Sequence, residues 1–352
     1  MFKMLRRLLE AKRSGAKPIL FTLSQAPDEA KEMGAGAMEL GNGTGVSEFV
    51  LLGLASRPAT RRLLFPLSLG IYLATLLGNL LVSLLSRQDP RLRQAPMYFF
   101  LAHLSLADVG FTTAAAPTAL RTLAFGSWAV PYAACLAQSY VFITFGVLEN
   151  FLLAVMAYDR YLAVCCLLRY TALMSPGRRW GLVGASGGLA QLHALLHTLL
   201  LARLPFPARP RLRHFFCDLR QLLALAGGDT WPNHAAVLAE GSLAVLGPLL
   251  LVAGSYGRIV ATLAQLPTAR GWSRALSTCG AHLAMVALFY GTVIGLFIRP
   301  AGHYAPWQDM VTTLLYSTVT PLLNPFIYSL RNQEMRGALR RVLGRGAAPQ
   351  GA

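Results

Sequence analysis

The sequence predicts an all-α membrane protein, a seven-transmembrane helix bundle with a short amphipathic C-terminal helix. Of its 352 residues, 55% are hydrophobic and only 13% are charged, about half the charge that a soluble domain usually carries. The apolar residues gather in seven stretches, each long enough for a helix to cross a hydrocarbon core of about 30 Å. The net charge is +17, and the basic residues lie between these stretches, where they suit anionic lipid headgroups better than nucleic acid.

The seven stretches are nearly free of charge. The second contains Asp108, the third contains Glu149 at mid-span and the fifth contains Glu240, whereas the other four contain no charged residue. Beyond the seventh, apolar residues between Met335 and Leu343 repeat at helical spacing opposite arginines, a pattern typical of a helix that lies along a membrane surface. The expected spans, in order, are Leu63–Ser86, Ala95–Leu120, Tyr132–Tyr161, Trp180–Ala202, Trp231–Tyr256, Ala275–Ile298 and Met310–Leu330.

The distribution of lysine and arginine predicts the orientation of the chain. These residues are more frequent in the loops 87–96, 158–179 and 257–274 and after Arg331 than in the opposite loops, which favours the cytoplasm for the first set. Asn42 begins an Asn-Gly-Thr glycosylation acceptor, which is used only outside the cytoplasm. We therefore expect a multi-pass plasma-membrane protein with an extracellular N-terminus, glycosylated at Asn42, and a cytoplasmic C-terminus.

The chain is expected to divide into four parts. Residues 1–37 contain no insertion signal and are expected to be an N-terminal extension, either disordered or belonging to an alternative start. Residues 38–62 are expected to form the extracellular N-terminus and residues 63–331 the seven-span domain. Residues 332–352 would then be the cytoplasmic amphipathic helix and tail.

Four polar residues fall at a comparable depth within the spans: Asn79, Asp108, Glu149 and Asn324. A charge at membrane depth costs at least ~2.5–3.5 kcal/mol, so each acid needs a partner. We expect a central polar cluster. Two acids together favour either a shared proton or a bound cation, such as sodium near Asp108 and Glu149, and a satisfied packing network is the equal alternative.

Two further groups of polar residues lie inside spans. His193 and His197 are four residues apart on one face of a helix, as metal ligands can be, but no cysteine or carboxylate is evidently placed to complete a site. We therefore expect packed or pocket-lining imidazoles and no metal site. Glu240 is expected to face a cavity and anchor a polar group of a ligand, or to extend toward the membrane surface.

Motifs at the ends of the third and seventh spans indicate a conformational switch. Asp159-Arg160-Tyr161 closes the third span with an adjacent acid and base, and in the seventh span Pro325 follows Asn324 inside an apolar helix, where a kink is expected. On the opposite side, a bond between Cys135 and Cys217 would pin the long loop that contains Cys217 over the end of the bundle.

These motifs resemble those of a rhodopsin-like (class A) G-protein-coupled receptor, and within that class those of an olfactory (odorant) receptor. The similarity runs from about Asn42 to Leu343. The residues that carry it include Gly78-Asn79, Pro96-Met97-Tyr98-Phe99-Phe100-Leu101, Met156-Ala157-Tyr158-Asp159-Arg160-Tyr161, Ser277-Thr278-Cys279-Gly280-Ala281-His282-Leu283 and Pro321-Leu322-Leu323-Asn324-Pro325-Phe326-Ile327-Tyr328.

The resemblance implies a receptor that is not an enzyme and that has no cofactor other than the possible sodium ion. It would bind small volatile molecules in the outer half of the bundle and activate a stimulatory, olfactory-type G protein, which raises cyclic AMP. The residues that the resemblance assigns to the switch and to G-protein coupling are Asp159, Arg160, Tyr161, Tyr256, Asn324, Pro325 and Tyr328. The implied ligand-binding candidates are Phe142, Ile143, Gly146, Val147, Val237, Glu240, Gly241, Ala244, Tyr290, Val293, Ile294, Phe297, Leu314 and Thr318.

The sequence also departs from the family pattern. Cys166 and Leu167 stand where the family usually has a short polar residue or histidine followed by proline, and Gly187 stands where tryptophan is usual. A receptor-like protein with weak or lost signalling is therefore an alternative. A membrane transporter is a weaker one, because no internal repeat is visible in the sequence.

Overall fold

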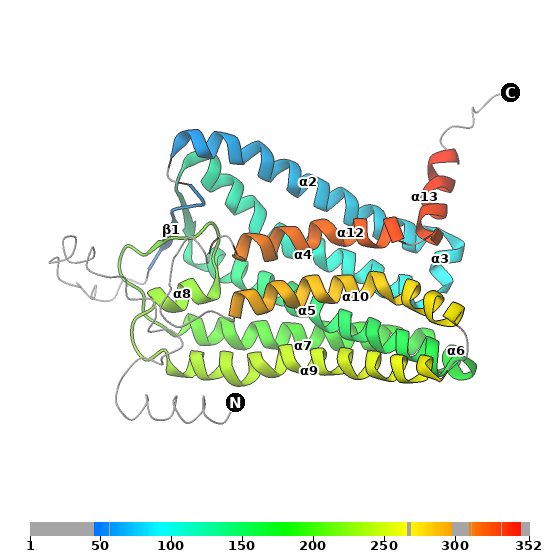
Figure 1. Cartoon of the computed structure of the whole chain (residues 1–352). Helices are drawn as coiled ribbons and strands as arrows, with labels where there is room; N and C mark the ends of the chain where they lie inside the picture. Colours follow the sequence, from blue (N-terminus) through cyan, green and yellow to red (C-terminus); the bar gives the residue numbers. More distant parts are fainter. Residues whose placement is uncertain are drawn as a thin grey trace.

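The computed structural model describes residues 46–55, 57–265, 269–297, 310, 312–331 and 333–345. The expected N-terminal extension, residues 1–37, and the glycosylation acceptor Asn42 lie outside the described residues. Within them, long helices lie side by side along one direction and form a single bundle (Figure 1). They are α2 (Pro58–Gln88), α4 (Pro96–Phe125), α5 (Tyr132–Cys165), α7 (Pro176–Ala202), α9 (Trp231–Ala264), α10 (Ala269–Phe297) and α12 (Thr320–Arg331), which continues a π-helical segment η3 (Leu315–Val319).

Each predicted span overlaps one long helix, and several helices extend beyond their spans. Helix α4 begins one residue after the predicted Ala95, the predicted end Ile298 lies outside the described residues, and η3 and α12 cover the seventh predicted span from Leu315 onward. Five of them, α2, α4, α5, α7 and α9, are long and apolar enough to cross a membrane, and α10 contains the shorter apolar stretch Cys279–Ile294. Large apolar side chains point away from the bundle: Leu77 on α2 is 70% exposed and Leu243 on α9 is 71% exposed. An apolar surface of this kind is stable against lipid rather than water.

Helix α5 forms the centre of the bundle, because α4, α7, α9 and α10 all pack against it. Its side chains Leu152, Met156 and Ala157 belong to one large apolar core together with Leu104 of α4 and Met285 of α10. The apolar residues that the sequence places on every face of these helices are thus divided between this core and the lipid-facing surface.

A three-stranded sheet, which the sequence analysis did not predict, covers one end of the bundle (Figure 1). The strand order is β2 (Trp128–Pro131), β1 (Glu48–Leu51) and β3 (Arg211–Leu212), with β1 antiparallel to β2 and parallel to β3. Phe49 and Leu51 of β1 are fully buried. Strands this short depend on pairing with distant segments rather than on a local pattern, so sequence periodicity does not reveal them.

Short helices complete the two ends. Helix α8 (Leu219–Leu225) lies near the sheet, and we call this the disulfide end after the bond described below. At the opposite end, which we call the α13 end, lie α3 (Pro90–Gln94), η2 (Leu167–Arg169), α6 (Tyr170–Leu173) and α13 (Gln333–Arg345), the last of these at the place where the sequence predicted an amphipathic helix.

Candidate functional site

Of the four polar residues expected at the centre of the bundle, Asp108 contacts both Asn324 and Glu149, and Asn79 bonds the helix that carries Asn324. The Asn324 side-chain nitrogen on α12 donates to both carboxylate oxygens of Asp108 on α4, at 3.0 and 2.8 Å. The carboxyl groups of Asp108 and of Glu149 on α5 are both buried and interact with each other, an arrangement that favours a shared proton. Asn79 on α2 donates to the Pro321 carbonyl on α12 at 2.9 Å. This central polar cluster therefore joins four helices.

Three buried oxygen atoms of the central polar cluster accept no hydrogen bond within the described part of the chain: Asn79 Oδ1, Glu149 Oε1 and Asn324 Oδ1. Buried acceptors of this kind normally bind a water molecule or a cation. All three atoms are oxygens, which sodium and other hard cations prefer as ligands. Binding of sodium near Asp108 and Glu149 stays a prediction.

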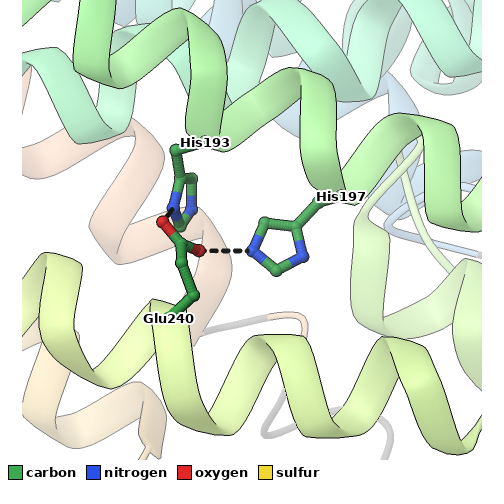
Figure 2. A group of neighbouring side chains, drawn as sticks. All are labelled: His193, His197 and Glu240. Carbon is green, nitrogen blue, oxygen red and sulfur yellow. Dashed lines mark hydrogen bonds and ion pairs between the residues drawn. The ribbon is translucent and has the colours of Figure 1, made fainter.

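Glu240 on α9 points at two histidines of α7 (Figure 2). Its Oε1 lies 2.6 Å from His193 Nδ1 and its Oε2 lies 3.1 Å from His197 Nε2. The sequence analysis expected no carboxylate to join this histidine pair, and that expectation was wrong, because the side-by-side packing of α7 and α9 brings in a residue more than forty positions away. The role of Glu240 as a ligand anchor stays a prediction.

One turn along α9 from Glu240, a buried hydrogen-bonded chain crosses three helices. Asn150 on α5 donates to the Ala244 carbonyl on α9 at 2.8 Å, and Tyr290 on α10 donates to Asn150 Oδ1 at 2.5 Å. Ala244 and Tyr290 were among the candidate ligand residues, whereas Asn150 was missed. Asn150 directly follows Glu149 in the sequence, and both side chains are buried in the bundle; a polar residue beside a predicted interior acid was the available signal.

Aromatic side chains from several elements pack together inside the bundle, next to the disulfide end. Phe142 of α5 stacks on Phe111 of α4 at 4.4 Å between ring centroids and meets Phe216 of the long loop at 4.6 Å. Tyr316 of η3 packs edge-on against Phe111 at 5.1 Å. We call Phe111, Phe142, Phe215, Phe216 and Tyr316 the aromatic cluster. Among its members, only Phe142 was a candidate ligand residue.

The other candidate ligand residues differ in burial and in what they pack against. A Cβ atom at Gly146 would lie 3.0 Å from both the Phe111 ring and Tyr316 Oη, so this glycine permits a close approach of helices. Leu314 packs against the cluster, and Val237 packs near the disulfide. Ile294 is 46% exposed, unlike the buried Tyr290 and Val293 on the same helix. The side chain of Phe297 lies outside the described residues, and Ile143, Val147, Gly241 and Thr318 are half-buried.

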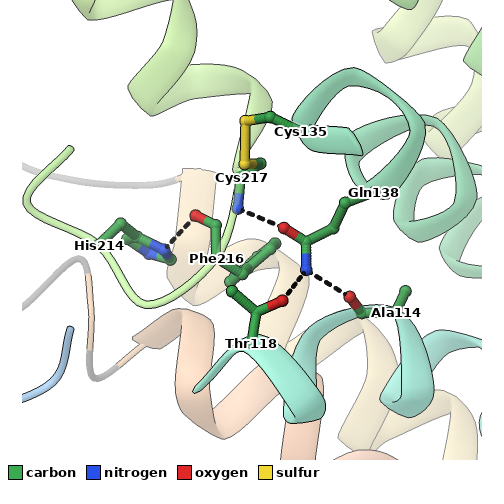
Figure 3. The surroundings of a disulfide bond; sticks show 7 residues. All are labelled: Ala114, Thr118, Cys135, Gln138, His214, Phe216 and Cys217. Atoms are coloured by element: carbon green, nitrogen blue, oxygen red, sulfur yellow. Dashed lines mark hydrogen bonds between the residues drawn. A yellow bond between two sulfur atoms is a disulfide. The ribbon is translucent and has the colours of Figure 1, made fainter. Parts of the chain in front are cut away.

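A disulfide joins Cys135 at the start of α5 to Cys217 in the long loop, with 5.4 Å between the Cα atoms (Figure 3). Gln138, which the sequence analysis missed, supports the same attachment. Its side-chain oxygen accepts from the Cys217 backbone N–H at 3.0 Å, and its nitrogen donates to the Ala114 carbonyl and to Thr118 Oγ1, at 2.7 and 2.8 Å. The loop residue Phe216 is thereby held against the bundle.

Most predicted switch residues lie toward the α13 end. Asp159 accepts a hydrogen bond from Tyr170 of α6 at 2.8 Å. Arg160 lies close enough to Cys279 and His282 on α10 for its charge to act on them. Tyr256 Oη on α9 lies 2.7 Å from His282 Nδ1.

A second contact of His282 extends this chain, since its Nε2 lies 3.1 Å from the Leu153 carbonyl on α5. Tyr161 packs beside Tyr158 on α5. Pro325 lies inside α12 as predicted and packs against α2 at Gly78, where a Cβ atom would lie 3.1 Å from its ring. The side chain of Tyr328 lies outside the described residues.

Comparison with known proteins identifies the family. The family model described as "Olfactory receptor" matches residues 68–345. The chain is 48% identical over 308 residues to olfactory receptor 1E5 of Pan troglodytes, which covers 88% of this chain and 98% of that protein. It is also 48% identical over 302 residues to olfactory receptor 1E1 of Homo sapiens, covering 86% of this chain and 96% of that protein. The chain belongs to the olfactory receptor family.

The fold of this olfactory receptor matches a solved structure of the wider class. Squid rhodopsin superposes with a TM-score of 0.63 over 82% of this chain and 87% of that chain, at 17% sequence identity. The protein is thus a multi-pass membrane receptor with a rhodopsin-like seven-helix fold, and its relatives are signalling receptors rather than enzymes. Membership of the family implies a small-molecule ligand and a G protein as partners.

Proposed function

We propose that this olfactory receptor binds small, volatile, largely apolar molecules beside the aromatic cluster and then activates a stimulatory, olfactory-type G protein, which raises cyclic AMP. In this proposal the disulfide end faces the outside of the cell and the α13 end faces the cytoplasm. The excess of basic residues in the loops of the α13 end supports that orientation.

The aromatic cluster is the observation that carries the proposal. It combines rings from α4, α5, η3 and the disulfide-bonded loop at one depth, so a ligand that packs there contacts four separate elements. Walls that are mostly aromatic and apolar suit a small hydrophobic ligand. The nearby Asn150–Tyr290 pair would provide the few polar groups that fix the orientation of such a ligand.

A route from the aromatic cluster to the α13 end follows α5, α9 and α10. Tyr316 of the cluster contacts Phe289, which is next to Tyr290 on α10. Further along, Tyr256, His282 and the Leu153 carbonyl connect the same three helices near Arg160. We propose that ligand binding changes the packing of Tyr316 and Tyr290, and that the ends of α9 and α10 then move relative to Arg160 to admit the G protein.

The surface of the α13 end suits such a partner. Leu168 in η2 is fully exposed, and the neighbouring Leu167 is mostly exposed. Two exposed leucines beside basic residues form a surface that a protein partner can cover. Leu167 is also one of the positions at which the sequence departs from the family pattern, so its effect on coupling is part of what the proposal must explain.

The proposal is tested by measuring cyclic AMP in cells that display the receptor, with a panel of odorants, with and without the stimulatory Gα subunit. Phe142→Leu keeps an apolar side chain but removes the stacked ring, and it should weaken the potency of active odorants by about tenfold, equivalent to about 1.4 kcal/mol. The control Leu192→Ala changes a lipid-facing residue of α7 and should leave potency unchanged.

Two outcomes would contradict the proposal. If odorants bind to the displayed receptor but no cyclic AMP forms, the chain is a receptor that has lost coupling to this G protein. If the potency of every active odorant is unchanged in Phe142→Leu, then the ligand does not bind beside the aromatic cluster.

A further inference from the structure

We infer that His193, His197 and Glu240 form a binding site for a divalent transition-metal ion of the zinc type, at the contact between α7 and α9. The three residues each offer one ligand atom, and these atoms lie within 4.8 Å of one another. It is the one such group of histidine, cysteine and acidic side chains in the described part of the chain. The site lies beside the proposed odorant site and does not depend on it.

The donor atoms suit zinc. Two imidazole nitrogens and one carboxylate are a ligand set of open zinc sites, in which a fourth position remains for water or another small ligand. Hard cations such as Ca²⁺ and Mg²⁺ prefer an all-oxygen set. Ligands bound tetrahedrally at about 2.0–2.1 Å from zinc lie about 3.3 Å apart. His193 Nδ1 and His197 Nε2 are already 2.6 and 3.1 Å from the carboxylate oxygens, so only small side-chain rotations are needed.

The helices hold the ligands in place before any metal binds. Spacing of four residues puts both histidines on the same face of α7, and their rings lie 4.6 Å apart between centroids. His197 is almost fully buried, whereas the Glu240 side chain is 36% exposed. The two imidazoles are therefore mostly covered, and Glu240 is the most accessible of the three ligands, so the fourth ligand would approach on its side.

The negative charge of Glu240 favours a cation at this site. Glu240 is the only charged residue between Trp231 and Tyr256, and Trp180–Ala202 contains none. No lysine or arginine of these spans competes with a metal for the carboxylate. At membrane depth an uncompensated carboxylate is costly, and either a proton on one histidine or a divalent ion removes that cost. When a metal binds, it occupies the ring nitrogens of His193 and His197 that face Glu240. Each neutral imidazole then carries its hydrogen on its other ring nitrogen.

A bound ion would also tie α9 to α7. Each of these helices packs along α5, and they contact each other over a shorter stretch. Glu240 lies one turn from Ala244, whose carbonyl accepts the hydrogen bond from Asn150. Zinc at this site would therefore restrain the segment of α9 that connects to the Asn150–Tyr290 pair, and so make odorant responses sensitive to zinc.

The test is a titration of the purified full-length receptor in lipid nanodiscs with ZnCl₂ alone, followed by calorimetry, without any odorant. The wild type should bind one Zn²⁺ through this site. His193→Gln, His197→Gln and Glu240→Gln should each weaken binding by at least about tenfold, whereas His103→Gln, a histidine of α4 outside the site, should not. Binding should also weaken between pH 7.5 and pH 5.5, because protonated imidazole cannot bind a metal.

His193→Cys separates a metal site from a hydrogen-bonded group, since a thiolate binds zinc but cannot replace the imidazole hydrogen bond to Glu240. This variant should keep Zn²⁺ binding, and Zn²⁺ should raise its melting temperature as it does for the wild type. The inference is overturned if the wild type shows no saturable Zn²⁺ binding, if the double variant His193→Gln/His197→Gln still binds it, or if His193→Cys binds no better than His193→Gln. None of these results depends on which odorant or G protein the receptor uses.

Discussion

Asn150 shows how a single buried side chain can join three helices. Its nitrogen donates to α9 and its oxygen accepts from Tyr290 on α10, while its backbone belongs to α5. An amide has a donor and an acceptor on separate atoms that can face two different helices, and an apolar residue could make neither contact. At this scale, the receptor's polar interior consists of groups whose partners lie on other helices.

Tyr290→Phe should therefore destabilise the receptor. The change removes one hydroxyl and leaves Asn150 Oδ1 buried without its donor, at a cost of about 1–3 kcal/mol. Thermal unfolding of the purified receptor measures the loss. Tyr72→Phe is the matched control, because its hydroxyl makes a longer, exposed contact to Thr113 at 3.3 Å, and its effect should be small. Equal melting temperatures for wild type and Tyr290→Phe would contradict the inferred link.

At the scale of elements, α13 is attached to the loop after α2 by one ion pair. Arg341 Nη2 lies 2.7 Å from Asp89 Oδ2, and Arg341 Nε donates to the same oxygen at 2.9 Å. Asp89 also caps α3 by accepting from the backbone N–H groups of Arg91 and Leu92. Burial alone would raise the pKa of Asp89, but the hydrogen bonds from Arg341 and from the two backbone groups outweigh it and hold that pKa below its ordinary value.

Asp89→Asn should weaken the attachment of α13, which Met335 and Ala338 also anchor in the core, while leaving α3 intact, since asparagine caps a helix about as well as aspartate. The expected loss of stability is about 1 kcal/mol, because Arg341 is partly exposed and its charge is screened by solvent. Asp89→Ala should cost more, because it removes the cap as well. A spin label on α13 and thermal unfolding provide the measurements.

The Asp89–Arg341 ion pair should make the stability of the receptor depend on pH in a defined direction. A carboxyl whose pKa is lowered on folding stabilises the folded state at pH values above its unfolded pKa, and loses that contribution as the pH falls through the folded value. The difference between wild type and Asp89→Asn should thus be constant between pH 7 and pH 5 and shrink only in stronger acid. A difference that disappears already near pH 6 would show that another group is responsible.

At the scale of the whole molecule, the central polar cluster joins α2, α4, α5 and α12 through side chains that are far apart in sequence. The carboxyl groups of Asp108 and Glu149 interact, which favours a shared proton, and Asn324 donates to Asp108. The cluster thereby fixes the relative position of four helices that are otherwise held by apolar packing, which is less specific about register.

Glu149→Gln should be tolerated, because its amide can donate to Asp108 in place of the shared proton. Glu149→Ala should instead cost about 1–3 kcal/mol, because Asp108 loses its partner. Thermal unfolding in choline chloride, without sodium, measures both changes. If Glu149→Gln is as unstable as Glu149→Ala under these conditions, the cluster requires the negative charge of Glu149 rather than its hydrogen bond.

The same variants test the prediction of a sodium ion. Replacing choline by sodium at constant ionic strength should stabilise the wild type, whose Glu149 Oε1, Asn79 Oδ1 and Asn324 Oδ1 remain open. It should have a smaller effect on Glu149→Gln, which offers less negative charge to the ion. An equal response of both proteins would contradict binding at this place.

The sequence by itself determined the helices, the membrane and the family. Length and hydrophobicity of a span are local properties, so the seven spans could be located without knowledge of their neighbours. The motifs around Arg160 and Asn324 were sufficient to recognise the class, and the spacing of Asp108 and Glu149 within their spans was sufficient to expect them at one depth.

The tertiary structure decided which side chains meet. The partner of the histidine pair on α7 is Glu240, the support of the disulfide-bonded loop is Gln138, and the partner of Asp159 is Tyr170. It also decided the pairing of the three short strands at the disulfide end. Each of these contacts joins groups that helix packing and loop attachment bring together. A helical repeat in the sequence shows which face of its helix a residue occupies, but not which helix lies against that face.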